Sequence, residues 1–587
     1  MRPPPTSDTS AEAVAWLADA GASAGDLVAL TLHPARIALA VTGHSATFET
    51  DDPAALVAEI EHDIGPRWVW WDRATADQLV ERGVAVARCW DVLTVHRLLH
   101  GGWRTSIAKA WAWLHGLSPD GLPTMGQLDL LSERPDEGDP DQPLRPDGYL
   151  RPEWIGGGWA DSPERMAVWA ELALATARLQ LVRIDALDDP ARVRSTAHAE
   201  SAAEYLCAEL SWHGLPVDVE EATRIIVDAV AERPRDEAHA LELQQARDAE
   251  VLRHLPPGPP VDLRSPVDVK AMLRRVAVDV PDTRAWRLEQ HRDAHPVVEA
   301  LLHWRKAERI ATTYGYRWLD EHVHGGRLRG EWTSSDGAAG RMTASSGLHN
   351  LPTEMRPAVA AEPGHVFVRA DLGQIEPRVL AAVSGDTALI AATADDDLYA
   401  PVATRLEVSR DIAKVAVLGA MYGATTGESA HALRGLEREY PVAMGLLADA
   451  AEAGQRGDDV FTIGGRRVRM WIDETVDDAG VGDIDRARRV AAARGRFARN
   501  AVIQGAAAEL FKVWAIIVRA RGAALGAEIV LCLHDELLVH APADRADAAA
   551  ALVHDALAEA AYRWSPAPDV RFVADVSVIG RWSEAKP

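Results

Sequence analysis

The chain has 587 residues, 48% hydrophobic and 26% charged, a balance typical of globular rather than disordered proteins. A formal net charge of −26 argues against a protein that coats nucleic acid through a uniformly positive surface, although an acidic exterior can surround a basic cleft. The sequence shows no apolar run of membrane-spanning length, no apolar centre of a secretory signal and three scattered cysteines without a CxxC pair, so we expect a cytoplasmic protein with reduced thiols.

The N-terminal third alternates between strand and helix patterns. Residues 26–41 predict two strands around a proline turn, and 67–72 predict a third short strand. Residues 117–163 are rich in Pro, Gly and Asp, which indicates a long surface loop or insert. A strong helical pattern then begins at Ser162-Pro163.

The middle of the chain is mostly helical in pattern. A loose joint is predicted near 186–197, followed by helices over 198–324. Residues 365–372 alternate as a strand, and Gly373 separates this strand from a helical stretch. Pro377 fits that stretch only in its first turn, where no helical N–H is lost.

Two carboxylates interrupt a predicted β-hairpin near the C-terminus. The strands Ile529–Leu533 and Leu537–His540 leave Asp535 and Glu536 where the chain reverses, although a tight turn favours Asn-Gly or Asp-Gly. The hairpin alone favours an ordinary solvated turn. If Asp535 meets Asp371, at the end of the 365–372 strand, the two would form a hard-oxygen site for Mg²⁺, and two such ions can clamp an in-line phosphoryl transfer.

Two helical segments carry polar residues spaced by four. In 410–423, Arg410, Lys414, Leu418 and Tyr422 share a face that suits a nucleoside triphosphate, although cations on a surface helix are commonly only solvated. In 496–512 the spacing aligns three side chains that can probe a minor groove or a sugar-phosphate backbone, or serve as ordinary surface groups: Arg496, Asn500 and Gln504.

Together these motifs carry a family resemblance. Residues from about 198 to 587 resemble the family A DNA polymerases, the DNA polymerase I family, in "DLGQIEPR" (371–378), "RDIAKVAVLGAMYG" (410–423) and "LHDE" (533–536). Further similar segments, in the family's order, are "AELSWHGLPVD", "VDLRSPVDVKAML" and "GRMTASSGLHNLP".

The resemblance implies a mixed α/β (α+β) chain: a ribonuclease H-like exonuclease-type domain, then a right-hand polymerase. The implied exonuclease-like domain is 1–190 and the polymerase domain 191–587, with its thumb at about 198–324, its palm at about 325–390 and 500–587, and its fingers at about 391–499.

The resemblance also implies roles for individual residues. Asp371, Asp535, Glu536 and Lys414 would be catalytic, and Asp371, Asp535 and the Leu372 carbonyl would hold two Mg²⁺ ions. Glu376 would crowd a 2′-hydroxyl and so favour deoxynucleotides. The implied nucleotide-binding residues are Gln374, Glu376, Arg410, Lys414, Leu418, Tyr422 and His534, and the implied DNA-binding residues are Arg341, Thr343, Asn350, Arg496, Asn500 and Gln504.

The chain departs from the family pattern at several positions. Leu418 stands where the family usually has an aromatic residue, Leu372-Gly373 replaces Tyr-Ser, and Pro377 replaces Leu. These changes keep the implied metal ligands but alter the surroundings of the nucleotide.

The first 190 residues resemble the family's 3′–5′ exonuclease scaffold without its metal ligands. The first strand lacks Asp-x-Glu, and the second motif's aspartate falls near Thr75, with Asp72 and Asp77 offset. Val168 and Leu172 occupy the third motif's Tyr and Asp positions, and leucine cannot bind Mg²⁺. We expect a degenerate exonuclease-like domain, unless Asp72 and Asp77 form a site in another register, and no 5′ nuclease domain.

The leading hypothesis is a monomeric, template-directed DNA polymerase that adds deoxynucleotides to a primer 3′ end, in repair or replication. The alternative is an inactive DNA-binding scaffold with a polymerase fold, which the net charge and the departures at 410–423 leave open. A single-subunit RNA polymerase is disfavoured by Glu376.

Overall fold

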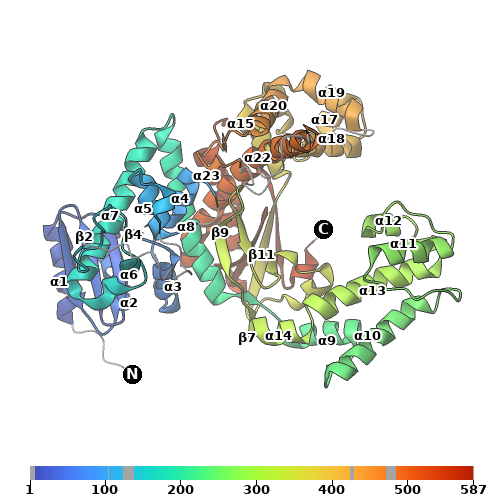
Figure 1. Ribbon diagram of the computed structural model, residues 1–587, viewed down its shortest axis with the longest axis horizontal. Coiled ribbons are helices and arrows are strands. Elements are labelled where there is room, and N and C mark those ends of the chain that lie inside the picture. The colour runs from blue at the N-terminus through green and yellow to red at the C-terminus, as the bar shows by residue number, and fades with distance from the viewer. Residues whose placement is uncertain (1–6, 103–104, 123–137, 424–428, 471–483, 586–587) are drawn as a thin grey trace. The chain divides into compact units, whose positions relative to one another are not determined.

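A computed structural model describes residues 7–102, 105–122, 138–423, 429–470 and 484–585 (Figure 1). The chain forms two compact units, each built from separate stretches of sequence. The first comprises Met1–Trp212, Trp332–Thr343 and Val368–Val578, and the second comprises His213–Glu331, Ala344–Phe367 and Ile579–Pro587.

A five-stranded mixed sheet organises the N-terminal part of the first unit, in the order β3-β2-β1-β4-β5. β1 pairs antiparallel with β2 and parallel with β4, and helix α7 packs against β1 and β2. The strands are β1 Leu27–His33, β2 Arg36–Val41, β3 His44–Glu49, β4 Arg67–Trp70 and β5 Cys89–Asp91. The three predicted strands are confirmed, whereas β3 was missed because its pattern is largely polar and β5 because it is very short.

Helices surround this sheet. Asp52, Asp72, Asp91 and Ser162 each accept a backbone N–H as an N-cap, which fixes where α2, α3, α4 and α7 begin. The start predicted at Ser162-Pro163 is therefore confirmed. The helices are α1 Ser7–Asp19, α2 Pro53–Asp63, α3 Arg73–Glu81, α4 Val92–His100, α5 Ile107–Leu114, α6 Pro152–Ile155 and α7 Pro163–Asp185.

The described part of the predicted 117–163 loop is irregular, with short helical turns and one isolated bridge between Leu144 and Leu150. Residues 123–137 of that prediction lie outside the described residues. The loose joint predicted near 186–197 is wrong over most of its length, because helix α8 spans Pro190–His213. Asp189 accepts the backbone N–H of Arg192 at 3.1 Å, and Pro190 opens the helix.

A four-stranded sheet, ordered β14-β15-β11-β16, lies at the centre of the C-terminal part of the first unit. Helices α22 and α23 pack against β14 and β15 (Figure 1). The strand predicted over 365–372 is confirmed as β11. The elements are β9 Trp332–Asp336, β10 Arg341–Ala344, β11 His365–Leu372, β14 Glu528–Leu533, β15 Glu536–Pro542, β16 Ala574–Ile579, α22 Ile484–Gly522 and α23 Ala546–Trp564.

Helix α22 lies in the core. The stretch Asp485–Leu525 is long and apolar enough to cross a membrane by length and composition, but 78% of its most apolar window is buried inside the protein. The sequence pattern did not single it out, because Glu509 and Lys512 interrupt it. Its burial is that of a core helix in a globular domain.

Six helices connect β11 to α22 in the described residues. Pro377 lies in the first turn of α15, as predicted, and α18 begins after the N-cap Ser409 and ends at Gly423 in the left-handed conformation, with φ of 73°. The elements are α15 Ile375–Ser384, α16 Thr387–Ala392, α17 Tyr399–Leu406, α18 Arg410–Tyr422, α19 Ser429–Glu439, α20 Pro441–Arg456, β12 Val460–Phe461 and β13 Arg467–Val468.

The second unit is mainly helical, as predicted for 198–324. An apolar cluster that includes Met272, Leu288 and Leu301 fills its core. A small sheet ordered β6-β8-β7 completes it. The elements are α9 Val219–Val230, α10 Glu237–Leu252, α11 Pro266–Arg275, α12 Ala285–Glu289, α13 Pro296–Thr313, α14 Tyr316–His322, β6 Leu215–Pro216, β7 Val323–His324 and β8 Arg327–Leu328. The predicted domain boundaries remain a prediction.

Two stacked histidines of α4 predict acid sensitivity. The His96 and His100 rings lie 4.9 Å apart, and His96 is 2% exposed. Burial, followed by the charge of His100, lowers the pKa of His96 to about 3. The unfolded chain therefore takes up a proton at this residue before the folded chain does, so stability is lost as pH falls from about 6.5 towards 3.

We expect His96→Phe to reduce the loss of unfolding free energy between pH 6.5 and pH 5 by about 1.5 kcal/mol, because phenylalanine keeps the ring and removes the titration. Urea unfolding at both pH values measures it. His554→Gln, at a histidine with a 71% exposed side chain, is the control. An unchanged pH dependence in the His96 variant would contradict the assignment.

Candidate active site

A two-residue turn places Asp535 at the tip of a hairpin. β14 and β15 pair antiparallel, and Leu533 faces Glu536, so His534 and Asp535 form the turn. His534 has a φ of 41°, the left-handed conformation that such a turn requires. The predicted hairpin is confirmed, but the position of Glu536 in the turn is wrong. Glu536 is the buried first residue of β15, because Arg369 donates a hydrogen bond to it at 2.9 Å.

The end of β11 meets this turn. The backbone N–H of Leu372 donates to the carbonyl oxygen of Asp535 at 2.8 Å, which brings Asp371 beside the turn. Burial, and then the charge of Asp371, raises the pKa of Asp535 to about 6. Burial also raises the pKa of Asp371, against the opposing charge of Arg369. The charges of Glu536 and Asp575 add to the rise at Asp371. Carboxylates whose charged forms are destabilised in this way suit a divalent cation, whose charge would stabilise both.

The residues that depart from the family pattern at this corner have structural reasons. Leu372 is 2% exposed and belongs to the core of the sheet. A Cβ atom added to Gly373 would lie 2.9 Å from Cγ2 of Val573, so only glycine fits without a shift of its neighbour. The Gly373 N–H also donates to the Val573 carbonyl at 2.9 Å. Close packing between β11 and the segment before β16 therefore accounts for Gly373, and burial in the sheet accounts for Leu372.

The face of α18 has the predicted order of side chains. Arg410 donates to Asp397 at 2.5 Å, Lys414 is exposed, Leu418 is half-buried and Tyr422 is 46% exposed. The cationic end of the helix is thus open to solvent. Asp397, which sequence reasoning missed, also accepts from the Gln374 side chain at 2.9 Å.

Glu376 is the centre of a polar cluster. Arg341 donates to it at 3.1 Å and the Tyr422 hydroxyl at 3.1 Å, while Gln504 contacts that hydroxyl at 3.4 Å. Burial, and then the charge of Glu376, raises the pKa of Tyr422. Four residues that were predicted from four separate segments therefore meet at one place in the first unit.

The remaining predicted DNA-binding residues do not form one contact set. Thr343 is half-buried on β10, and Arg496 is exposed on α22. Asn500 has a buried side-chain oxygen that finds no hydrogen-bond partner among the described residues. Asn350 belongs to the second unit, where its carbonyl accepts from the Tyr314 hydroxyl at 2.7 Å.

His534 lies at the turn beside Asp535, with its side chain exposed on one side and partly covered on the other. Burial, and then the charge of Arg341, lowers the pKa of His534. The neutral imidazole can therefore accept or donate a hydrogen bond beside the paired carboxylates.

Arg369 is a further residue that sequence reasoning missed. It precedes Asp371 by two positions on β11, so both side chains lie on the same face of the strand. It donates to Asp371 at 2.7 Å and to Glu536 at 2.9 Å. The alternation of the strand was the available signal, but a basic residue was not expected beside carboxylates that were predicted to bind metal.

The carboxylates of the N-terminal part have structural partners. Asp72 caps α3 and Asp77 pairs with Arg73 at 3.0 Å. Val168 and Leu172 pack against the apolar core. Asp91, which was not predicted, accepts from Thr94 N–H and Trp70 Nε1, and burial raises its pKa to about 7. Each of these three aspartates therefore has a protein partner in the structure.

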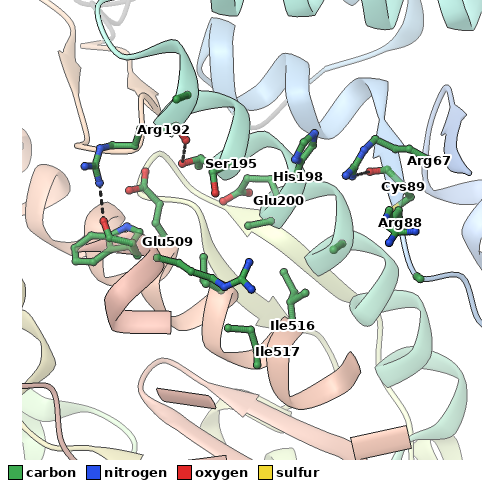
Figure 2. A pocket seen from close by; sticks show the side chains of 18 of the residues that line it. Arg67, Arg88, Cys89, Arg192, Ser195, His198, Glu200, Glu509, Ile516 and Ile517 are labelled. Carbon is green, nitrogen blue, oxygen red and sulfur yellow. Dashed lines mark hydrogen bonds between the residues drawn. The ribbon is translucent and has the colours of Figure 1, made fainter. Parts of the chain in front are cut away.

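A pocket of about 550 Å³ lies apart from these residues, between α8, α22 and the starts of β4 and β5 (Figure 2). Beside it, the buried Glu200 carboxylate accepts from Lys512 at 2.7 Å and from Arg466 at 2.6 Å. All three side chains are at most 3% exposed. This network joins α8 to α22 and to the β12–β13 hairpin.

The fold is that of a right-hand nucleic-acid polymerase. The chain resembles the solved structure of the POL domain of Pol1 from M. smegmatis in complex with DNA primer-template and dNTP. The TM-score is 0.67, the sequences are 22% identical, and the match covers 98% of each chain. The paired carboxylates on the central sheet and the cation-bearing α18 agree with this class.

The chain belongs to DNA polymerase family A, whose family model matches residues 258–584, more than half of the sequence. DNA polymerase I of Thermus thermophilus is 32% identical over 312 residues, which are 47% of this chain and 35% of that protein. DNA polymerase I of Deinococcus radiodurans is 26% identical over 447 residues, or 69% of this chain and 43% of that protein. The chain thus spans less than half the length of these relatives.

Proposed function

We propose that the protein is a template-directed DNA polymerase that adds deoxynucleotides to a primer 3′ end and releases pyrophosphate. The observation that carries this proposal is the junction of β11 with the β14–β15 turn, where the Leu372–Asp535 hydrogen bond of 2.8 Å holds Asp371 beside Asp535. Membership of DNA polymerase family A supports the same reaction, and so do relatives named DNA polymerase I.

Two Mg²⁺ ions would be held by Asp371, Asp535 and the Leu372 carbonyl. The pKa of Asp535 is raised to about 6 because its charge is destabilised by burial and by Asp371, and a bound cation would stabilise that charge. Bound ions would clamp the attacking and leaving oxygens of the transfer. Lys414 and Arg410 of α18 would bind the triphosphate. Arg410 would then give up its ion pair with Asp397 and donate to phosphate oxygens in its place. Gln374, Leu418, Tyr422 and His534 would surround the nucleotide.

The proposed DNA-contacting residues are Arg341, Thr343, Asn350, Arg496, Asn500 and Gln504. Loss of 3′–5′ exonuclease activity belongs to the same proposal, because Val168 and Leu172 offer no metal ligand and pack against the core. Action in repair or replication, a monomeric state and a cytoplasmic location are further parts of it.

The proposed choice of sugar gives a direct prediction. Replacing Glu376 by alanine should raise the ratio of ribonucleotide to deoxynucleotide incorporation by at least about 10-fold, because the group that crowds the 2′-hydroxyl is removed. Single-nucleotide incorporation with dATP and ATP measures the ratio. Tyr422→Phe is the matched control, since it removes the hydroxyl that contacts Glu376 and leaves the carboxylate. An equal rise of the ratio in both variants would contradict a separate role for the Glu376 carboxylate, because loss of the Tyr422 hydroxyl alone would then have the same effect.

The test of the whole proposal is extension of a labelled primer-template with Mg²⁺ and deoxynucleotides, beside a lane without nucleotides. Extension without trimming supports a polymerase that lacks exonuclease activity. Trimming that persists in the Asp371→Ala variant would show that the N-terminal carboxylates support 3′–5′ exonuclease activity.

An inactive DNA-binding scaffold is the second candidate, favoured by the ion pair between Arg369 and Asp371 at 2.7 Å. A scaffold would bind primer-template without extending it.

A further inference from the structure

Arg369 is a cation that lies among the carboxylates beside the proposed metal site. Its side chain is 8% exposed and pairs with Asp371 at 2.7 Å, with Glu536 at 2.9 Å and with Asp575 at 3.6 Å. Three strands of the central sheet supply these partners: β11, β15 and β16. A single guanidinium thus ties together acids that would otherwise repel each other.

The three ion pairs of Arg369 differ in solvent exposure, and this difference decides which carboxylate can leave the arginine for a metal ion. The side chain of Glu536 is 9% exposed, like that of Arg369, so their pair lies inside the protein. The side chain of Asp371 is 35% exposed and that of Asp575 is 73% exposed. Glu536 can therefore hold the arginine in place, while Asp371 lies where a solvated ion can reach it.

A metal ion that binds Asp371 must overcome both the existing ion pair and the positive charge of the guanidinium. Arg369 uses Oδ2 of Asp371, one of the two oxygens that the carboxylate can offer to a metal. Two cations this close also repel each other, more strongly in a partly buried site than in water. Removal of the arginine should therefore strengthen metal binding and not weaken it.

We propose that Arg369 is a resident cation that competes with the divalent metal for Asp371, and so sets the metal concentration at which the site fills. It is a positioning residue: in the absence of metal it holds Asp371 and Glu536 in their places on the sheet. This inference rests on the proposed metal site of Asp371 and Asp535.

The test measures metal binding directly, by electron paramagnetic resonance of free Mn²⁺ in titrations of the full chain without DNA or nucleotide. Arg369→Ser should lower the Kd for Mn²⁺ by about 10-fold, because it frees Oδ2 of Asp371 and removes a positive charge that repels the metal. The matched control is Arg519→Ser. Arg519 is also largely buried, with a 14% exposed side chain, and pairs with Glu209 at 2.6 Å away from these residues, so the Kd should not change.

Arg369→Lys keeps the charge but cannot bridge both acids as the guanidinium does, and it should lower the Kd about 3-fold. If circular dichroism shows that Arg369→Ser is unfolded, the lysine variant carries the test. A Kd that is unchanged or raised in the folded variant would overturn the competition, since a purely structural arginine would alter only the thermal midpoint.

Failure of the metal site itself gives a different result. In that case wild type and the Asp371→Asn, Asp535→Asn double variant would bind Mn²⁺ equally, which contradicts the proposed site and this inference together. Binding that is lost in the double variant, yet equal in wild type and Arg369→Ser, contradicts the inference alone.

Discussion

Asp535→Asn is expected to slow primer extension by on the order of 1000-fold while leaving primer-template affinity within a few-fold of wild type. Asparagine has nearly the same shape, so the two-residue turn and the hydrogen bond from Leu372 N–H to the Asp535 carbonyl can persist. The substitution removes the negative charge with which the proposed site would hold its metal. The effect should therefore lie in the rate of transfer and not in folding or in DNA binding.

Single-turnover extension and fluorescence anisotropy with the same labelled primer-template measure the two quantities. Asp544→Asn is the control, because it is the same chemical change at an exposed residue that follows the far end of β15. Extension by Asp535→Asn at more than about a tenth of the wild-type rate would exclude Asp535 as a metal-holding residue. A parallel loss of DNA binding would indicate a folding defect in the turn.

Lys512→Met is expected to destabilise the first unit by about 3–5 kcal/mol, the usual cost of removing one partner from a buried ion pair. Lys512 is 1% exposed and donates to both oxygens of Glu200, at 2.7 and 2.8 Å. Methionine fills a similar volume but leaves Glu200 with Arg466 as its remaining cation. Differential scanning calorimetry should show a lower unfolding midpoint for the transition of this unit.

Lys306→Met is the matched substitution at the surface. Lys306 pairs with Glu354 at 2.9 Å, but their side chains are 57% and 32% exposed, so its loss should cost no more than about 1 kcal/mol. The double variant Glu200→Gln, Lys512→Met should be less destabilised than the sum of its single variants, because the attraction between Glu200 and Lys512 is then lost only once, and both variants that lack Glu200 share the cost of removing it from Arg466. Equal effects of Lys512→Met and Lys306→Met would contradict a structural role for the buried network.

Local patterns predicted the elements that carry the candidate site. The alternation of 365–372 predicted β11, the two apolar runs around 534–535 predicted β14 and β15, and the spacing by four over 410–423 predicted α18. Each signal depends on neighbours within a few residues, so it can be read without knowledge of the fold. The ends of these strands raised the meeting of Asp371 and Asp535 only as a hypothesis, which the family resemblance then supported.

Long-range partners could not be predicted in this way. Glu536 was placed in the turn because nothing near it in sequence indicates that Arg369, 167 positions earlier, draws it into the sheet. The pairing of Glu200 with Lys512 spans 312 positions. The joint near 186–197 was misjudged because polar residues conceal the start of α8, where the Asp189 side chain caps the first turn.

The length of α22 has an evolutionary consequence. One unbroken helix of 39 residues carries Gln504 near its middle and Arg519 near its end, where Arg519 donates to the Val86 carbonyl of the N-terminal part at 3.2 Å. The Tyr205 hydroxyl of α8 donates to Val84 at 2.6 Å, and the Tyr205 ring packs in the apolar core of the N-terminal sheet. Deletion of the first sheet would expose Tyr205 and Ala208, the two α8 residues of this core, and the end of α22. Natural selection for folding alone would therefore retain the N-terminal region, with or without any chemistry of its own.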